Sequence, residues 1–255
     1  MPFEKIQSER LSAAVVTQIE LLILRGILRP GERLPAERDL ADRLGVSRPS
    51  LREAIASLAE DGLVESRAGA GVFVADVLTP AFSPALVRLF ERHDEAVFDY
   101  LSFRRDLEGL AAERAARRAS ETDLAVIAEV MDKMEVAHKK RSGADEAALD
   151  AEFHLAIIEA SHNTVMLHMM RSMFGLLREG VFYNRKIMFA QRTTRTKLLA
   201  QHRAINAALQ ERDAARARKA VEDHLAYVES CLRDHRLALR HETIARQRLE
   251  HEKTR

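Results

Sequence analysis

The stretch 34–52, LPAERDLADRLGVSRPSLR, constrains the fold most strongly because it predicts two short helices joined by a tight turn. Gly45 ends the first of them, since glycine readily adopts the positive φ of a helix C-terminal cap. Ser47 is a good N-cap for the second helix, and Pro49 suits its first turn, where no backbone N–H is needed. This order of features is the helix-turn-helix plan, whose second helix enters the DNA major groove.

An apolar stripe defines the face of the second helix that should be buried. It consists of Leu51, Ala54, Ile55 and Leu58, which recur at helical spacing. Arg48, Ser50 and Arg52 lie off this stripe, and we expect them to face outward. Because arginine paired with guanine is the commonest specific contact, Arg48 and Arg52 are the best candidates for reading base edges.

Two short β-type runs follow, and they complete the motif. Residues 63–67 and 72–75 flank the small, glycine-rich segment 68–71, which predicts a hairpin of the kind called a wing. Gly69 at its tip would let the backbone approach DNA closely.

Bulk charge does not identify a nucleic-acid partner. The formal net charge is only +1, and residues 1–75 hold ten Lys+Arg against eleven Asp+Glu. The positions of the arginines are more informative than the net charge, because phosphate contacts act locally and salt screens more distant charges. The arginines on the expected recognition elements are Arg38, Arg43, Arg48, Arg52 and Arg67.

The rest of the chain favours an all-α domain, so the predicted fold class is mostly α. No proline follows Pro84, and strong helix formers dominate. We expect a linker over 76–83 and a bundle over 84–240, with Ser120 and Asp123 resembling a capping box. The expected helices span 84–91, 95–118, 121–141, 145–160, 163–183, 193–210 and 213–240. The polar end, 241–255, is expected to fray.

Cysteine content and hydropathy predict a cytoplasmic protein. Cys231 is the single cysteine, which excludes an intramolecular disulfide and suits a reducing compartment. No apolar run approaches the roughly 20 residues that span a bilayer, and the N-terminal stretch has no signal-peptide apolar region.

Four polar residues in the predicted bundle have the spacing of a metal site. Asp150 and His154 are four residues apart and share one helix face, while His202 and His224 belong to two later helices. All four lie in apolar surroundings, and bundle cores commonly hold such sites. The ligand set suits Zn, Ni, Mn or Fe(II). The alternative is that the histidines are exposed or make single hydrogen bonds.

Residues 11–75 resemble the winged helix-turn-helix of the GntR family of bacterial transcription regulators. The resemblance is carried by RPGERLPAERDLADRLGVSRPSLREAIASLAEDGLVESRAGAGVFV. It implies a homodimer that reads a short palindromic operator in double-stranded DNA. The residues expected at DNA are Arg38, Ser47, Arg48, Pro49, Ser50, Arg52 and Gly69.

Residues 95–235 resemble the FCD-type ligand-binding domain of the FadR subfamily. The matching segments begin at Arg104, Asp150, Ala160 and His202 and end with His224. Many members bind a metal through these Asp and His positions, and all are filled here, which implies that Asp150, His154, His202 and His224 hold a divalent ion. The resemblance also implies that Arg104 binds an effector carboxylate. Spacing alone favours a solvated ion pair between Arg104 and Glu108.

Within the subfamily, the full-length pattern is most similar to repressors of the pyruvate dehydrogenase complex. Some of those lack the Asp/His pair, whereas Asp150 and His154 are present here, as in lactate and glycolate regulators. The expected function is a repressor controlled by pyruvate, lactate, glycolate or a related acid. Two alternatives are a regulator with a purely structural metal and a metal-dependent enzyme that activates water. No separate general base supports the enzyme.

Overall fold

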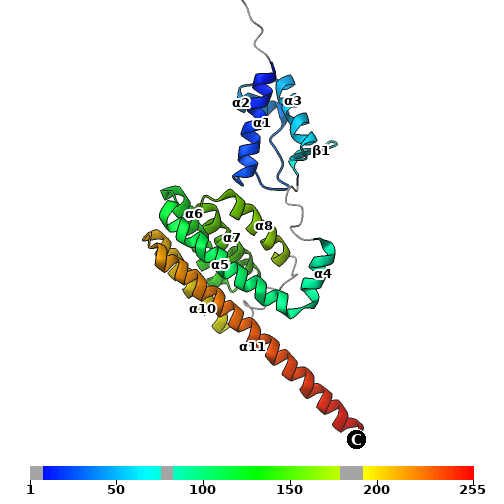
Figure 1. The fold of residues 1–255 in the computed structure, drawn as a ribbon, viewed down its shortest axis with the longest axis vertical. Helices are drawn as coiled ribbons and strands as arrows, with labels where there is room; N and C mark the ends of the chain where they lie inside the picture. Colours follow the sequence, from blue (N-terminus) through cyan, green and yellow to red (C-terminus); the bar gives the residue numbers. More distant parts are fainter. Residues whose placement is uncertain (1–7, 76–82, 179–191) are drawn as a thin grey trace, which may run out of the picture. The chain divides into compact units, whose positions relative to one another are not determined.

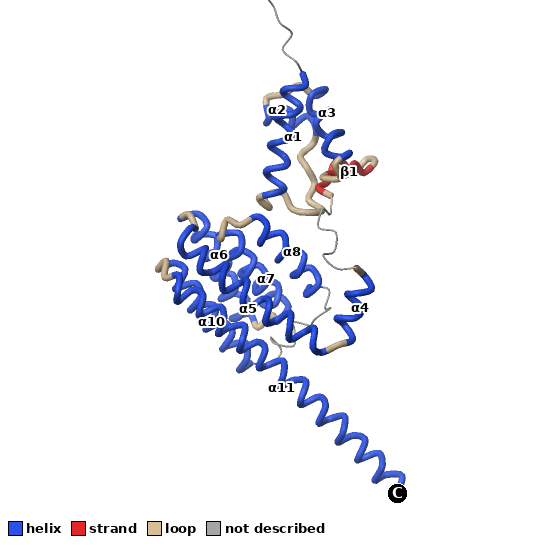
Figure 2. The backbone as a smooth tube through the Cα atoms, in the orientation of Figure 1, coloured by secondary structure: helices blue, strands red, loops and turns tan. Residues whose placement is uncertain are grey.

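The computed structural model describes residues 8–75, 83–178 and 192–255. The chain divides into two compact units, Met1–Ala81 and Phe82–Arg255, and each is described by itself. The combination of a helix-turn-helix with a small hairpin and an all-helical unit confirms the predicted fold class (Figures 1 and 2). Most of the predicted linker, residues 76–82, lies outside the described residues.

The first unit forms the predicted helix-turn-helix. Gly45 caps α2 with a φ of 65°, and the Ser47 hydroxyl accepts a hydrogen bond from the Ser50 backbone N–H at the start of α3. Leu51 and Leu58 are fully buried in a core that also receives α1 and the hairpin. The elements are α1 (Ser8–Leu24), α2 (Glu37–Leu44), α3 (Arg48–Glu60), β1 (Val64–Arg67) and β2 (Gly71–Val74).

The two strands pair antiparallel and form the predicted wing. Val64 lies opposite Val74, and Arg67 lies opposite Gly71. Arg33 adds an isolated bridge to the outer side of the hairpin. Gly71 has a φ of 108°, and a Cβ atom built there would lie 2.9 Å from Nε of Arg33. The backbone conformation therefore favours glycine at this position, and a Cβ atom would also displace the side chain of Arg33.

Gly71→Ala should therefore destabilise the first unit by about 1–3 kcal/mol, because L-residues rarely adopt this φ. Urea unfolding of the full chain measures the loss. Gly62→Ala is the comparison: Gly62 has a φ of 71°, so alanine is strained there too, but this φ lies nearer the left-handed region that L-residues tolerate and no atom lies near the would-be Cβ, so its loss should be smaller. Equal stability of Gly71→Ala and the wild type would contradict this explanation of the wing.

The second unit is a helical bundle. Helix α5 lies alongside α11, and α7 packs against α5, α6 and α8 (Figure 1). Two apolar clusters fill the interior, one around Met170 and Leu101, the other around Ile127 and Ile205. The described helices are α4 (Pro84–Arg92), α5 (Asp94–Arg118), α6 (Glu121–Lys140), α7 (Gly143–Ala160), α8 (Thr164–Arg178), α10 (Arg192–Gln210) and α11 (Ala214–Thr254).

The expected fraying of 241–255 is wrong in this structure. Helix α11 runs to Thr254 as one continuous helix that passes beyond the bundle (Figure 2). Ion pairs one turn apart support the exposed part, for example Arg246 Nε with Glu242 Oε1 at 2.8 Å. The end of the helix predicted over 163–183 lies outside the described residues. Within the described ranges, no helix combines the length and apolar character that crossing a bilayer requires.

Candidate metal centre and DNA-reading surface

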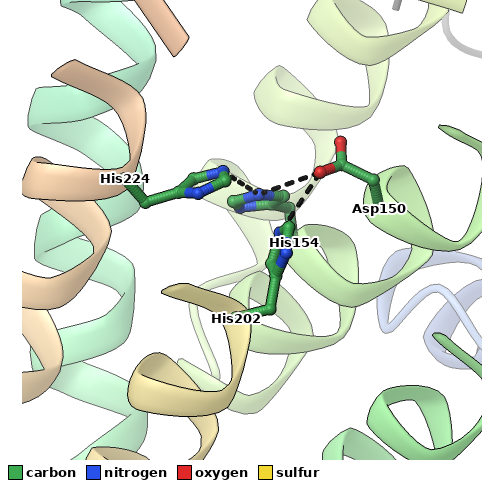
Figure 3. Close-up of side chains that lie close together, drawn as sticks. All are labelled: Asp150, His154, His202 and His224. Atoms are coloured by element: carbon green, nitrogen blue, oxygen red, sulfur yellow. Dashed lines mark hydrogen bonds and ion pairs between the residues drawn. The ribbon is translucent and has the colours of Figure 1, made fainter. Parts of the chain in front are cut away.

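Asp150, His154, His202 and His224 meet inside the second unit (Figure 3). Asp150 and His154 come from consecutive turns of α7, His202 from α10 and His224 from α11. One ligand atom from each lies within 4.8 Å of the others, and all four side chains are buried. The alternative of exposed histidines is therefore wrong. Three helices that are separate in sequence supply one compact group of nitrogen and oxygen donors.

The ring nitrogens converge on a common point. Nε2 of His154 lies 3.3 Å from Nε2 of His224, and Nε2 of His202 lies 3.2 Å from Oδ1 of Asp150. Oδ1 of Asp150 is also 3.9 Å from Nε2 of His154. All three imidazoles thus direct the same ring atom toward the carboxylate or toward one another (Figure 3).

A further shell of polar groups fixes how the rings are protonated. Oε2 of Glu108 lies 2.6 Å from Nδ1 of His154 as an ion-pair contact, and because a carboxylate can only accept, this proximity favours a proton on Nδ1. Oε1 of Gln201 lies 3.1 Å from Nδ1 of His224 and accepts from it in the same way. In the neutral rings, Nε2 then presents a lone pair. Two lone pairs facing each other at 3.3 Å form an arrangement that a cation stabilises.

Burial favours the neutral form of two of the three imidazoles, His202 and His224. Burial lowers the pKa of His202, and burial together with the neighbouring His202 and His154 lowers the pKa of His224 well below its usual value. Burial opposes ionisation of Glu108, but the positive charge of Arg104 and the interactions with His154 outweigh it and lower the pKa of Glu108 to about 2. Neutral imidazoles are the form that coordinates a metal ion.

Arg104 lies beside this group and is only 1% exposed. Its Nε donates to Oε1 of Glu108 at 2.6 Å, and its guanidinium lies near the rings of Tyr100 and Phe174. The pairing with Glu108 predicted from spacing is present, but the predicted solvated face is wrong, because neighbouring helices cover this part of α5. Glu108 itself was expected only as the partner of Arg104. Its contact with His154 depends on the packing of α5 against α7, which carries no sequence signal.

The expected DNA-reading residues lie on the first unit. Arg38, Arg48 and Arg52 are exposed, and Nε of Arg52 donates to Oε2 of Glu37 at 2.8 Å. Gly69 is exposed between the two strands. Pro49 occupies the first turn of α3, and Ser47 caps it.

The outward orientation expected for Ser50 is wrong. Its side chain is only 4% exposed, and its hydroxyl lies 2.8 Å from that of Ser47. The N-cap draws this residue inward, because the first turn of α3 must close on the Ser47 hydroxyl.

Comparison with family models assigns both units. Residues 11–74 match the bacterial regulatory proteins of the gntR family, and residues 99–227 match the FCD domain. A solved structure described as Streptococcus agalactiae GntR aligns with a TM-score of 0.55 at 25% identity, covering 88% of this chain and all of that one.

Curated relatives agree over nearly the full chain. A protein of Escherichia coli K12, provisionally named as an L-lactate dehydrogenase operon regulatory protein, is 35% identical, over 88% of this chain and 87% of its own. The Glc operon transcriptional activator of Escherichia coli K12 is 33% identical, over 90% of this chain and 92% of its own. LutR, an HTH-type transcriptional regulator of Bacillus subtilis 168, is 32% identical, over 83% of this chain and 96% of its own.

A winged helix-turn-helix followed by a helical domain with a buried polar group defines a transcription regulator rather than an enzyme. The chain belongs to the GntR family of bacterial regulatory proteins and carries an FCD domain of the FadR type.

Proposed function

We propose that this chain is a homodimeric repressor whose DNA binding is controlled by a small carboxylate, bound at or near a divalent metal in the FCD domain. The observation that carries the proposal is the convergence of Asp150, His154, His202 and His224 in a buried position. Burying three imidazoles and a carboxylate is costly unless each finds a partner, and one cation would satisfy all four.

The donor set fits Zn, Ni, Mn or Fe(II), which accept mixed imidazole and carboxylate ligands. Asp150, His154, His202 and His224 would hold the ion, while Glu108 and Gln201 orient the rings of His154 and His224. When bound, the metal would supply a Lewis-acidic centre for the oxygen atoms of a small acid.

The residues beside the candidate metal centre also support a class of effector. Arg104 provides a buried guanidinium that can bind a carboxylate with two parallel hydrogen bonds. Pyruvate, lactate and glycolate all place a carboxylate beside a keto or hydroxyl oxygen. Among them we favour lactate, because one relative is named for an L-lactate dehydrogenase operon. The resemblance to repressors of the pyruvate dehydrogenase complex keeps pyruvate as the second candidate.

A thermal-shift screen tests this function. Metal-loaded and EDTA-stripped protein are each heated with lactate, pyruvate, glycolate and citrate. An acid at about 100 times its Kd should add roughly 2.7 kcal/mol to the free energy of unfolding. We expect one of the smaller acids to stabilise only the metal-loaded protein. If stripping destabilises the protein but no acid has any effect, the metal is purely structural, and the proposed effector class is wrong.

On DNA, we propose that Arg48 and Arg52 contact base edges and that Arg38 and Ser47 hold phosphates or adjacent bases. Gly69 would approach the minor groove or the backbone. Two copies would read a short palindrome, since the symmetry of a dimer is mirrored in its operator. The acid can change DNA affinity only if it binds one arrangement of the two heads better than the other.

Arg52→Ala should weaken operator binding by about 1–3 kcal/mol and relax specificity at one base pair, because a lost bidentate contact removes discrimination there. The operator is first obtained by selecting duplexes from a random pool with the wild-type protein. Affinities of the variant for that duplex and for its single-base substitutions are then measured. Arg118→Ala, an exposed arginine at the end of α5, is the control. Unchanged affinity of Arg52→Ala would remove Arg52 from the interface.

A further inference from the structure

We propose that Glu108 is a positioning residue that fixes the proton of His154 on Nδ1 and thereby directs the Nε2 lone pair of that ring toward the metal. The same carboxylate binds Arg104, so it joins the candidate effector arginine to a metal ligand. The inference rests on the proposed function for the presence of a metal. Its statement about the His154 proton applies to the metal-free protein as well.

Each of the two carboxylate oxygens of Glu108 lies beside a different nitrogen. Oε1 of Glu108 accepts from Nε of Arg104 at 2.6 Å, and Oε2 lies 2.6 Å from Nδ1 of His154. The exposures of the three residues are 1% for Arg104, 2% for Glu108 and 1% for His154. Bulk solvent therefore does not reach these contacts, and a polar group left without a partner here is costly.

A buried glutamine at position 108 could not make the same two contacts as Glu108. A glutamine has the same shape, but it offers one acceptor oxygen and one donor NH₂ group. One of its ends must then face Arg104 and the other must face His154. Because Arg104 can only donate, the amide oxygen turns to Arg104 and the NH₂ group turns to His154.

That arrangement would reverse the tautomer of His154. Nδ1 would have to accept from the amide, so the ring proton would move to Nε2 and point toward Nε2 of His224, 3.3 Å away. A protonated ring nitrogen cannot coordinate a metal. Glu108→Gln therefore removes one of the four ligands without altering any ligand residue.

The arrangement also makes the two candidate sites interdependent. An effector carboxylate that binds Arg104 must share the guanidinium with Glu108, and any change in the position of Glu108 reaches His154 directly. Coupling of this kind is reciprocal, so a metal held by His154 also influences the affinity of Arg104 for the effector.

Two measurements on full-length Glu108→Gln test the inference. Competition with a chromophoric chelator gives the Zn²⁺ affinity, which should fall 10- to 100-fold, the effect typical of losing a group that orients a metal-bound histidine. Nitrogen-15 NMR of histidine-labelled, metal-free protein at fixed pH reports the tautomer, and the His154 proton should move from Nδ1 to Nε2.

Glu113→Gln is the matched control. Glu113 lies on the same helix and also accepts from two arginines, Arg117 at 2.7 Å and Arg218 at 3.1 Å, but in the described part of the chain its hydrogen-bond and ion-pair partners include no histidine. It should keep wild-type Zn²⁺ affinity and leave the histidine tautomers unchanged. If Glu108→Gln does not fold, Glu108→Asp replaces it. Its carboxylate is one methylene too short to reach both donors, so it should lower Zn²⁺ affinity by a smaller factor.

The outcomes separate this inference from the proposed function. If the wild type does not bind Zn²⁺ or another of the four metals, the proposed metal is wrong, and the NMR result alone decides the role of Glu108. If the wild type binds Zn²⁺ and the folded variant binds it equally with His154 still protonated on Nδ1, Glu108 has only a structural role and the inference is overturned.

Discussion

Asp150→Asn is expected to abolish most of the stabilisation that the proposed metal would give to the wild-type protein. At free metal 100 times its Kd, the wild type should gain about 2.7 kcal/mol in free energy of unfolding. Asparagine keeps the shape of Asp150 but removes the negative charge and the carboxylate oxygen that faces His202 at 3.2 Å. A 100-fold loss of affinity would leave only about 0.4 kcal/mol at the same free metal.

Thermal unfolding with and without metal measures this difference. Asp106→Asn serves as the control, because the side chain of Asp106 on the neighbouring helix α5 is 74% exposed and takes no part in the cluster. It should retain the full metal-dependent shift. A wild-type shift in Asp150→Asn would mean that the ion, if bound, does not use this carboxylate.

Phe153→Ala is expected to cause the largest loss of stability, about 3–5 kcal/mol, since it removes a fully buried ring from the centre of the bundle. The ring of Phe153 meets those of His202 and His154 edge to face, with centroids 5.2 and 6.1 Å away. Its removal should therefore loosen two of the candidate metal ligands as well as leave a cavity. Urea unfolding of the metal-free protein measures the first effect, and Zn²⁺ titration measures the second.

Two comparisons sharpen this prediction. Phe103→Ala, at a partly buried position in the same unit, should cost clearly less. Phe153→Leu fills most of the cavity and should recover much of the stability, but not the edge-to-face contacts. Similar losses for Phe103→Ala and Phe153→Ala would show that the ring of Phe153 has no special part in the core.

The sequence alone was sufficient to predict the turns and helix caps, which depend on residues close together in the chain. Gly45 and Ser47 define the turn between α2 and α3, and Ser120 with Asp123 forms the predicted capping box at the start of α6. These contacts span at most four residues, so residue type and spacing specify them. The i,i+4 placement of Asp150 and His154 on one face of α7 is predictable for the same reason.

Two of the incorrect expectations show where that reasoning fails. Ser50 lies off the apolar stripe, yet hydrogen bonding to the Ser47 cap buries it, because polar partners as well as apolar ones determine burial. Residues 241–255 lack an apolar face, but their helix propensity and i,i+4 ion pairs continue α11 to Thr254.

The sequence by itself determined the helix-turn-helix, the wing, the helical character of the second unit and the identities of the four candidate ligands. Only the tertiary structure decided that His202 on α10 and His224 on α11 meet the Asp150–His154 face of α7 in a buried position. It also decided that Glu108 connects Arg104 to His154. The physical reason is that helices form from local interactions, whereas their relative positions depend on packing between segments far apart in the chain, 46 residues for Glu108 and His154 and 70 residues for His154 and His224.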